Sequence, residues 1–158
     1  MVSNSADKIK VVFVCLGNIC RSPMAEAVFK AEIKKLGLSN RFVVDSAGTA
    51  AYHASITRRD PVLLFRSVQT CKKYGVPVCK EDYLTADYLL CMDRSNLSDL
   101  KSRAPKGSKA KILLLGSFDP EGQIIIEDPY YGGVKGFDNN YHQVVRSCNG
   151  FLEHLGMI

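Results

Sequence analysis

The sequence predicts an α/β fold: a single three-layer domain in which a central twisted parallel sheet of about four strands carries helices on both faces. Short apolar segments rich in β-branched residues alternate along the chain with longer segments of helical periodicity. The 158 residues are also enough for one domain that buries a core without disulfides or metals. We therefore expect one domain over residues 1–158, with an ordered core from residue 7.

The first half of the chain begins this alternation. Residues 11–15 form a near-continuous apolar run, which is typical of a buried strand. A helix is expected to follow, with Pro23 at its first position, Leu36 on its apolar face and Gly37 as its stop. Residues 42–44 are the second strand candidate.

The second half continues in the same way. Residues 61–74 are compatible with a helix, residues 88–92 with a strand and residues 96–101 with a short helix. A fourth strand is expected at residues 112–115 and a long helix from about residue 138 to residue 155, with Tyr141 on its apolar face. Parallel sheets bind ligands at the carboxyl ends of their strands, so functional residues should follow Val14, Val44, Met92 and Leu115.

One motif, CLGNICRSP at residues 15–23, joins the first strand to the first helix. A short loop before a helix directs several backbone N–H groups at one point, where the helix dipole favours a dianion. Gly17 and Asn18 tolerate the left-handed backbone that such a loop needs. Arg21 can hold two phosphate oxygens, and the same field favours a nucleophilic thiolate at Cys15 that Ser22 can hydrogen-bond. The alternative is a buried cysteine at a strand end, followed by a capping serine.

Residues 14–26 resemble the active-site loop of the low-molecular-weight protein tyrosine phosphatases, and IEDPYYG at residues 126–132 resembles that family's acid loop. Residues 44–49 and 88–93 also match, so the resemblance covers nearly the whole chain except an atypical segment at about residues 54–80. It implies a protein tyrosine phosphatase or acid phosphatase that hydrolyses aryl phosphate monoesters through a cysteinyl-phosphate intermediate. Its partners would be phosphotyrosine proteins and small aryl phosphates, and it would use no cofactor or metal.

The expected catalytic residues are Cys15, Arg21 and Asp128. Asp128 lies on a proline-stiffened loop and can protonate the leaving oxygen. The resemblance places Leu16, Ile19 and Tyr52 at the pocket mouth, and it makes Ser46 a hydrogen-bonding support for Asn18. The residues expected to bind phosphate or substrate are Leu16, Gly17, Asn18, Ile19, Cys20, Ser22, Tyr52, Tyr130 and Tyr131.

Two other functions stay open at this point. The first is an arsenate reductase of the same fold, with Cys79 and Cys91 as candidate relay thiols. The second is a catalytically weakened phosphotyrosine-binding variant. The family normally has a histidine that supports the loop asparagine, and this chain has none between His53 and His142. We therefore expect Asn18 to lack this one support and the phosphate-binding loop to be looser than the motif alone suggests.

Composition excludes other classes. The net charge of +5 is not concentrated in one segment, so nucleic acid is not expected as a partner. The apolar run after the polar first ten residues is too short for a membrane segment. The three histidines lack metal-ligand spacing. We expect a cytoplasmic monomer or weak dimer with reduced thiols, in which oxidation joins Cys15 to Cys20.

Overall fold

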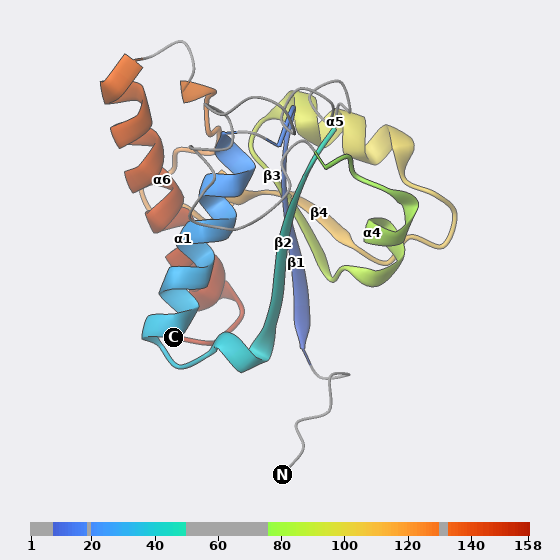
Figure 1. The fold of residues 1–158 in the computed structure, drawn as a ribbon, viewed down its shortest axis with the longest axis horizontal. Coiled ribbons are helices and arrows are strands. Elements are labelled where there is room, and N and C mark those ends of the chain that lie inside the picture. Colours follow the sequence, from blue (N-terminus) through green and yellow to red (C-terminus); the bar gives the residue numbers. More distant parts are fainter. Residues whose placement is uncertain (1–7, 19, 50–75, 130–132) are drawn as a thin grey trace.

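The computed structural model describes residues 8–18, 20–49, 76–129 and 133–158 (Figure 1). In this part of the chain, four strands form one parallel sheet in the order β2-β1-β3-β4. The expected sheet is therefore confirmed. The strands are β1 (Ile9–Cys15), β2 (Phe42–Gly48), β3 (Tyr88–Cys91) and β4 (Lys111–Leu114).

Helices cover both faces of this sheet (Figure 1). One layer consists of α1 (Arg21–Lys35) and α6 (Gly133–His154), which contact each other. The other layer consists of α4 (Lys80–Thr85) and α5 (Arg94–Arg103). Two short 3-10 helices, η2 (Ser39–Arg41) and η4 (Leu115–Phe118), lead into β2 and out of β4.

The alternation of side chains along β1 divides the core between the two layers. Phe13 and Cys15 face α1 and α6, whereas Val12 and Val14 face α4 and α5. Phe29 of α1 packs against the Phe13 ring with a centroid separation of 5.6 Å and is fully buried. Cys15 is thus the last inward residue of a strand that is buried on both sides.

Several expected boundaries and faces are wrong in detail. Helix α1 begins at Arg21, so Pro23 occupies its third position and not its first. Leu36 is 44% exposed because it is already the C-cap, after which the chain turns at Gly37 with a φ of +69°. Helix α4 was not expected at all. The candidate helix at residues 61–74 lies outside the described residues.

The last helix also differs from its prediction. Helix α6 begins at Gly133 rather than near residue 138, and Tyr141 is 49% exposed. In its first half, α6 directs the buried amides of Asn140 and Gln143 at the segment before Asp128. Its apolar stripe therefore starts only at Val144. Phe151, which the sequence pattern did not single out, is fully buried.

The order of the strands creates a switch point. The chain runs from β1 through α1 to β2 on one side and later returns to β3 on the other side of β1. The carboxyl ends of β1 and β3 therefore flank the position where open α/β sheets bind ligands. After β4, the acidic residue Asp119 forms an ion pair with Arg146 of α6, and a functional residue after Leu115 stays a prediction.

This ion pair leads to a stability prediction. The Asp119 carboxylate is fully buried, and Arg146 donates to both of its oxygens, at 3.0 and 3.1 Å. Asp119→Asn should lower the free energy of unfolding at neutral pH by about 2 to 3 kcal/mol, because a charged hydrogen-bond partner is lost. The pair of the half-buried Glu32 with the exposed Lys35 gives a control, since a single bond to a solvated lysine is lost and Glu32→Gln should cost less than about 1 kcal/mol.

The same pair should make stability depend on acid pH. Burial alone would raise the pKa of Asp119, but the bonds from Arg146 and from the Glu121 backbone bring that pKa below its ordinary value of 3.8. A carboxyl group with a lowered pKa in the folded state stabilises the fold above its unfolded pKa and loses this contribution as the pH falls. Urea unfolding should show that the difference in free energy of unfolding between wild type and Asp119→Asn becomes smaller below about pH 4. If this difference stays the same at low pH, the lowered pKa of Asp119 does not account for it.

Candidate active site

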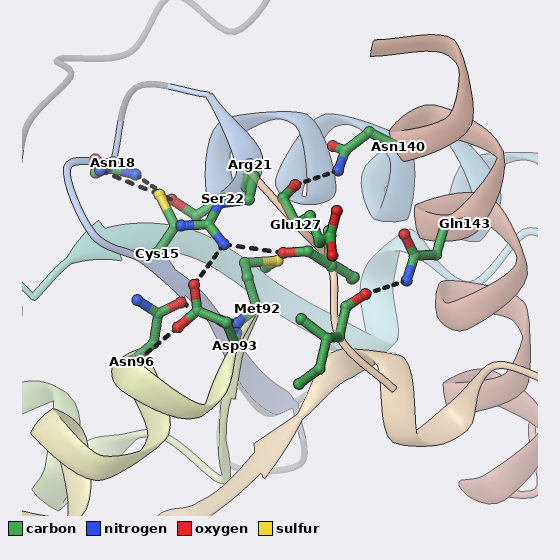
Figure 2. A network of polar contacts seen from close by, with 12 residues as sticks. Cys15, Asn18, Arg21, Ser22, Met92, Asp93, Asn96, Glu127, Asn140 and Gln143 are labelled. Carbon is green, nitrogen blue, oxygen red and sulfur yellow. Dashed lines mark hydrogen bonds and ion pairs between the residues drawn. The ribbon is translucent and has the colours of Figure 1, made fainter. Parts of the chain in front are cut away.

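Cys15 lies at the carboxyl end of β1 and is 3% exposed. Its Sγ accepts the backbone N–H of Asn18 at 3.2 Å and lies 3.1 Å from the Ser22 Oγ (Figure 2). Ser22 Oγ accepts from Asn18 Nδ2, and its single hydroxyl hydrogen can point to the sulfur or to the Ala47 carbonyl oxygen, which lies 3.4 Å away. The sulfur thus lies within hydrogen-bonding distance of two groups that can donate to it.

The loop of residues 15–22 is held by the side chain of Asn18, the non-glycine residue in the described chain with a positive φ, +54°. Asn18 Nδ2 donates to Ser22 Oγ and to Ser46 Oγ, both at 2.9 Å, and its Oδ1 accepts the Val76 N–H at 3.2 Å. The expected bond between Asn18 and Ser46 is present, and the lack of a histidine does not leave the Asn18 oxygen without a donor. A backbone N–H from the segment before α4 bonds to its oxygen, and sequence reasoning looked only for a histidine side chain.

Two further contacts fix the loop from below. Ser46 Oγ donates to the buried Glu26 Oε1 at 2.7 Å, which ties β2 to α1. At Gly48 a Cβ would lie 2.9 Å from the Leu16 carbonyl oxygen and 3.0 Å from the Asn18 nitrogen. Only glycine lets the end of β2 pass this close to the loop, so the loop is packed directly on the sheet.

Arg21 is the first residue of α1, and it is 4% exposed. Its Nη1 donates to Asp93 Oδ2 at 2.7 Å and to the Ile126 carbonyl oxygen at 2.9 Å (Figure 2). In the described part of the chain both bonds of the guanidinium use Nη1. Nε and Nη2 can therefore donate to an anion in the loop.

Asp93 is the functional residue that sequence reasoning missed. It directly follows β3 and is the N-cap of α5, where its Oδ1 accepts the Asn96 N–H at 2.8 Å. One carboxylate oxygen thus caps a helix while the other binds Arg21. Its place at the carboxyl end of a strand was the available signal, because a functional residue was expected after Met92.

The acid loop begins beside this group. The Ile126 N–H donates to the Met92 carbonyl oxygen at 2.9 Å, and its own carbonyl accepts from Arg21. Asp128 follows two residues later and is exposed. The structure brings the segment that carries Asp128 against the arginine of the loop.

The remaining predicted residues fall into two groups. Leu16 is 41% exposed at the loop surface, Gly17 is buried, and Cys20 is half-buried as the N-cap of α1. The proposed Cys15–Cys20 disulfide stays a prediction, and neither residue is in a disulfide here. The predicted residues outside the described part of the chain are Ile19, Tyr52, Tyr130 and Tyr131.

The candidate relay thiols do not join this group. Cys91 pairs in register with Val14, so its side chain faces α4 and α5, on the opposite side of the sheet from Cys15. Burial, with a smaller effect of Asp93, raises the pKa of Cys91 to about 12. Cys79 is exposed at the N-cap of α4. These positions do not favour the thiol relay that an arsenate reductase requires.

The described residues contain neither a metal-binding cluster nor a membrane-spanning helix. No group of three or more histidine, cysteine, aspartate or glutamate side chains within residues 8–18, 20–49, 76–129 and 133–158 is placed to hold a metal ion. In the same ranges, no helix is both long and apolar enough to cross a bilayer.

Comparisons with known proteins give one consistent family. Residues 10–157 match the sequence model of the low molecular weight phosphotyrosine protein phosphatases. The human protein of that name is 49% identical over 152 residues, covering 90% of this chain and 93% of the relative. The relative in Schizosaccharomyces pombe is 44% identical, with 93% and 97% covered.

Solved structures agree with this similarity. A protein tyrosine phosphatase from Entamoeba histolytica, with Hepes in its active site, superposes with a TM-score of 0.77 at 33% identity, covering 94% of this chain and 97% of that one. DARP, a Drosophila arginine phosphatase, superposes with a TM-score of 0.78 at 37% identity, with 93% and 98% covered.

Proposed function

Because this chain belongs to the low molecular weight phosphotyrosine protein phosphatase family, we propose that it hydrolyses phosphotyrosine in proteins, and small aryl phosphates, at Cys15. The observation that carries this proposal is the buried Cys15 sulfur, which accepts a backbone N–H and faces a hydroxyl in a loop that ends at Arg21. A thiol in such surroundings is a nucleophile for a bound phosphate dianion.

In the first step the Cys15 thiolate attacks phosphorus, and the bond from phosphorus to the ester oxygen breaks. Asp128 gives its proton to the leaving oxygen, which departs as a phenol or tyrosine. Arg21 Nε and Nη2 and the loop N–H groups bind the equatorial oxygens, where charge is highest in the transition state. The product of this step is a phosphate bonded to the Cys15 sulfur.

In the second step the Asp128 carboxylate takes a proton from a water molecule, and the water oxygen attacks phosphorus. The bond from sulfur to phosphorus breaks, and Cys15 leaves as a thiolate. The Ser22 hydroxyl, 3.1 Å from the sulfur, stabilises this leaving group by a hydrogen bond. Inorganic phosphate is released, and Asp128 is again protonated for the next cycle. The positive field that the reaction needs comes from Arg21 and the loop.

A cytoplasmic setting belongs to the same proposal, because Cys15 must stay reduced to act. The rival function of a binding module without turnover is less favoured. A module that only binds phosphate has no use for a thiol placed to form a bond with phosphorus, or for an exposed carboxylic acid on an adjacent loop.

The substrate class can be tested on the wild-type protein with three matched phosphopeptides. Cys15 is 3% exposed at the base of the loop, so a phosphate on a long aryl group should reach it better than one on a short side chain. We expect kcat/KM for phosphotyrosine to exceed that for phosphoserine by roughly a hundredfold. Phosphoarginine is the sharpest competitor, since one relative is named an arginine phosphatase. Faster release from phosphoarginine or phosphoserine would overturn the proposed substrate class.

A further inference from the structure

The segment that leads to Asp128 is held by two amide side chains of α6. Asn140 Nδ2 donates to the Glu127 carbonyl oxygen at 2.9 Å (Figure 2). Gln143 Nε2 donates to the Ile125 carbonyl oxygen at 2.7 Å and to that of Gln123 at 3.1 Å. A carbonyl oxygen can only accept, so the nitrogen of each amide must face the segment. We call residues 123–128 the acid segment.

The acid segment is also bonded from its other side. The carbonyls of residues 125 and 127 accept from α6, whereas the Ile126 carbonyl between them accepts from Arg21 at 2.9 Å. Successive carbonyls of an extended chain point in opposite directions, so this alternation is what an extended segment between two donors would show. The segment before Asp128 is thus fixed between α6 and the arginine of the loop.

Hydrogen bonds, rather than packing, hold the side of the segment that faces α6. Asn140 is 4% exposed and Gln143 is 8% exposed. A cavity of about 630 Å³ lies beside them and is also lined by Asp128 and Pro129. Because no side chain of the described residues fills that volume, the two amides are the described groups that limit movement of the segment in this direction. Burial makes the loss of either donor costly, since it leaves a carbonyl unsatisfied.

We propose that Asn140 and Gln143 are positioning residues, which hold the acid segment so that Asp128 meets the leaving oxygen. The proposal rests on the proposed function and deepens it. The part of α6 that carries the two amides is anchored, because Val144 and Cys148, which follow along the helix, lie in the core. A displacement of about 1 Å in a catalytic group can cost as much as a hundredfold in rate. Asp128 should therefore depend on two residues that touch no substrate.

The test compares Asn140→Ala and Asn140→Asp with wild type over aryl phosphates of increasing leaving-group pKa. The aspartate variant keeps the size of the side chain but turns an acceptor toward the Glu127 carbonyl. We expect kcat/KM for phenyl phosphate to fall about tenfold or more, and that for p-nitrophenyl phosphate to fall less than about threefold. An acidic leaving group needs little protonation, so it does not report a misplaced acid.

Gln143→Ala should show the same dependence on leaving group, and Asn139→Ala is the matched control. Asn139 is the exposed neighbour on α6, and it lines the same cavity without a bond to the acid segment in the described residues. Inhibition by inorganic phosphate should change less than about threefold in every variant, because Asp93 still orients Arg21. Thermal melting of each variant reports whether it is folded.

The outcomes separate this proposal from the proposed function. A wild type that hydrolyses no aryl phosphate would overturn both. A wild type that is active, with variants that lose the same factor for every leaving group, would overturn the positioning role alone. Loss of phosphate inhibition together with a lower melting temperature would show a general structural role, and it would equally overturn the proposal. A loss that grows with leaving-group pKa at a nearly constant affinity for phosphate supports it.

Discussion

Cys15→Ser is expected to abolish turnover of aryl phosphates while inorganic phosphate still binds. The sulfur is held by the Asn18 N–H and the Ser22 hydroxyl in a way that favours a thiolate. A serine alkoxide is far harder to form at neutral pH, so the same geometry around an oxygen gives no nucleophile. Binding should persist, because the loop amides and Arg21 are unchanged. The measurements are steady-state release of phosphate and equilibrium binding of phosphate by calorimetry.

Two companion variants make this result specific. Arg21→Ala should lose both turnover and phosphate binding, since its guanidinium supplies the charge and two of the donors. Cys79→Ser changes an exposed thiol at the N-cap of α4 and should leave both quantities near the wild-type values. Hydrolysis that survives in Cys15→Ser would refute a covalent mechanism, and phosphate binding that survives in Arg21→Ala would refute the role of Arg21.

The loop was predictable from sequence because its parts are adjacent in the chain. A buried strand, a glycine and an asparagine, then an arginine and serine at a helix start, lie within residues 11–22, so local preferences place them. The parallel sheet followed from the same alternation of apolar strands and helices. These features needed no knowledge of which distant segments meet.

The partners of the loop were not predictable in the same way. Arg21 meets Asp93 across 72 positions, and Asn18 meets Val76 across 58. The second case is instructive, because a backbone N–H carries no signature in sequence. Reasoning from side chains alone found no histidine to support Asn18 and therefore expected a loose loop. The fold supplied the donor from the main chain.

The faces of the helices were predicted only in part, for a related reason. Tyr141 fits an apolar stripe on α6, yet the adjacent turn of that helix faces polar backbone through Asn140 and Gln143. Periodicity shows that a helix has an apolar stripe. It does not show where along the helix contact with the apolar core ends and contact with polar backbone begins. The same amides were overlooked as functional residues, because asparagine and glutamine on a helix are most often solvated.

Asp128→Ala is expected to lower kcat by roughly 10² to 10⁴ for substrates with a basic leaving group, the usual contribution of a general acid. The carboxyl group follows the acid segment, whose Ile126 carbonyl bonds Arg21, so the acid and the phosphate-binding arginine are linked through two residues of backbone. Without the acid, a phenolate must leave unprotonated. The loss should therefore shrink as the leaving group becomes more acidic.

The measurement is kcat/KM for wild type and Asp128→Ala over a series of aryl phosphates, plotted against leaving-group pKa. This quantity reports the transfer to Cys15 and excludes the later hydrolysis, in which Asp128 acts as a base. The slope should be much steeper in the variant than in wild type. Asp128→Asn keeps the shape of the side chain without an ionisable proton, and it should follow the alanine line. Glu127→Gln, at the exposed residue just before it, should follow wild type. Parallel lines for wild type and Asp128→Ala would mean that the proton comes from another group. If Glu127→Gln follows the wild-type line, Glu127 is not that group.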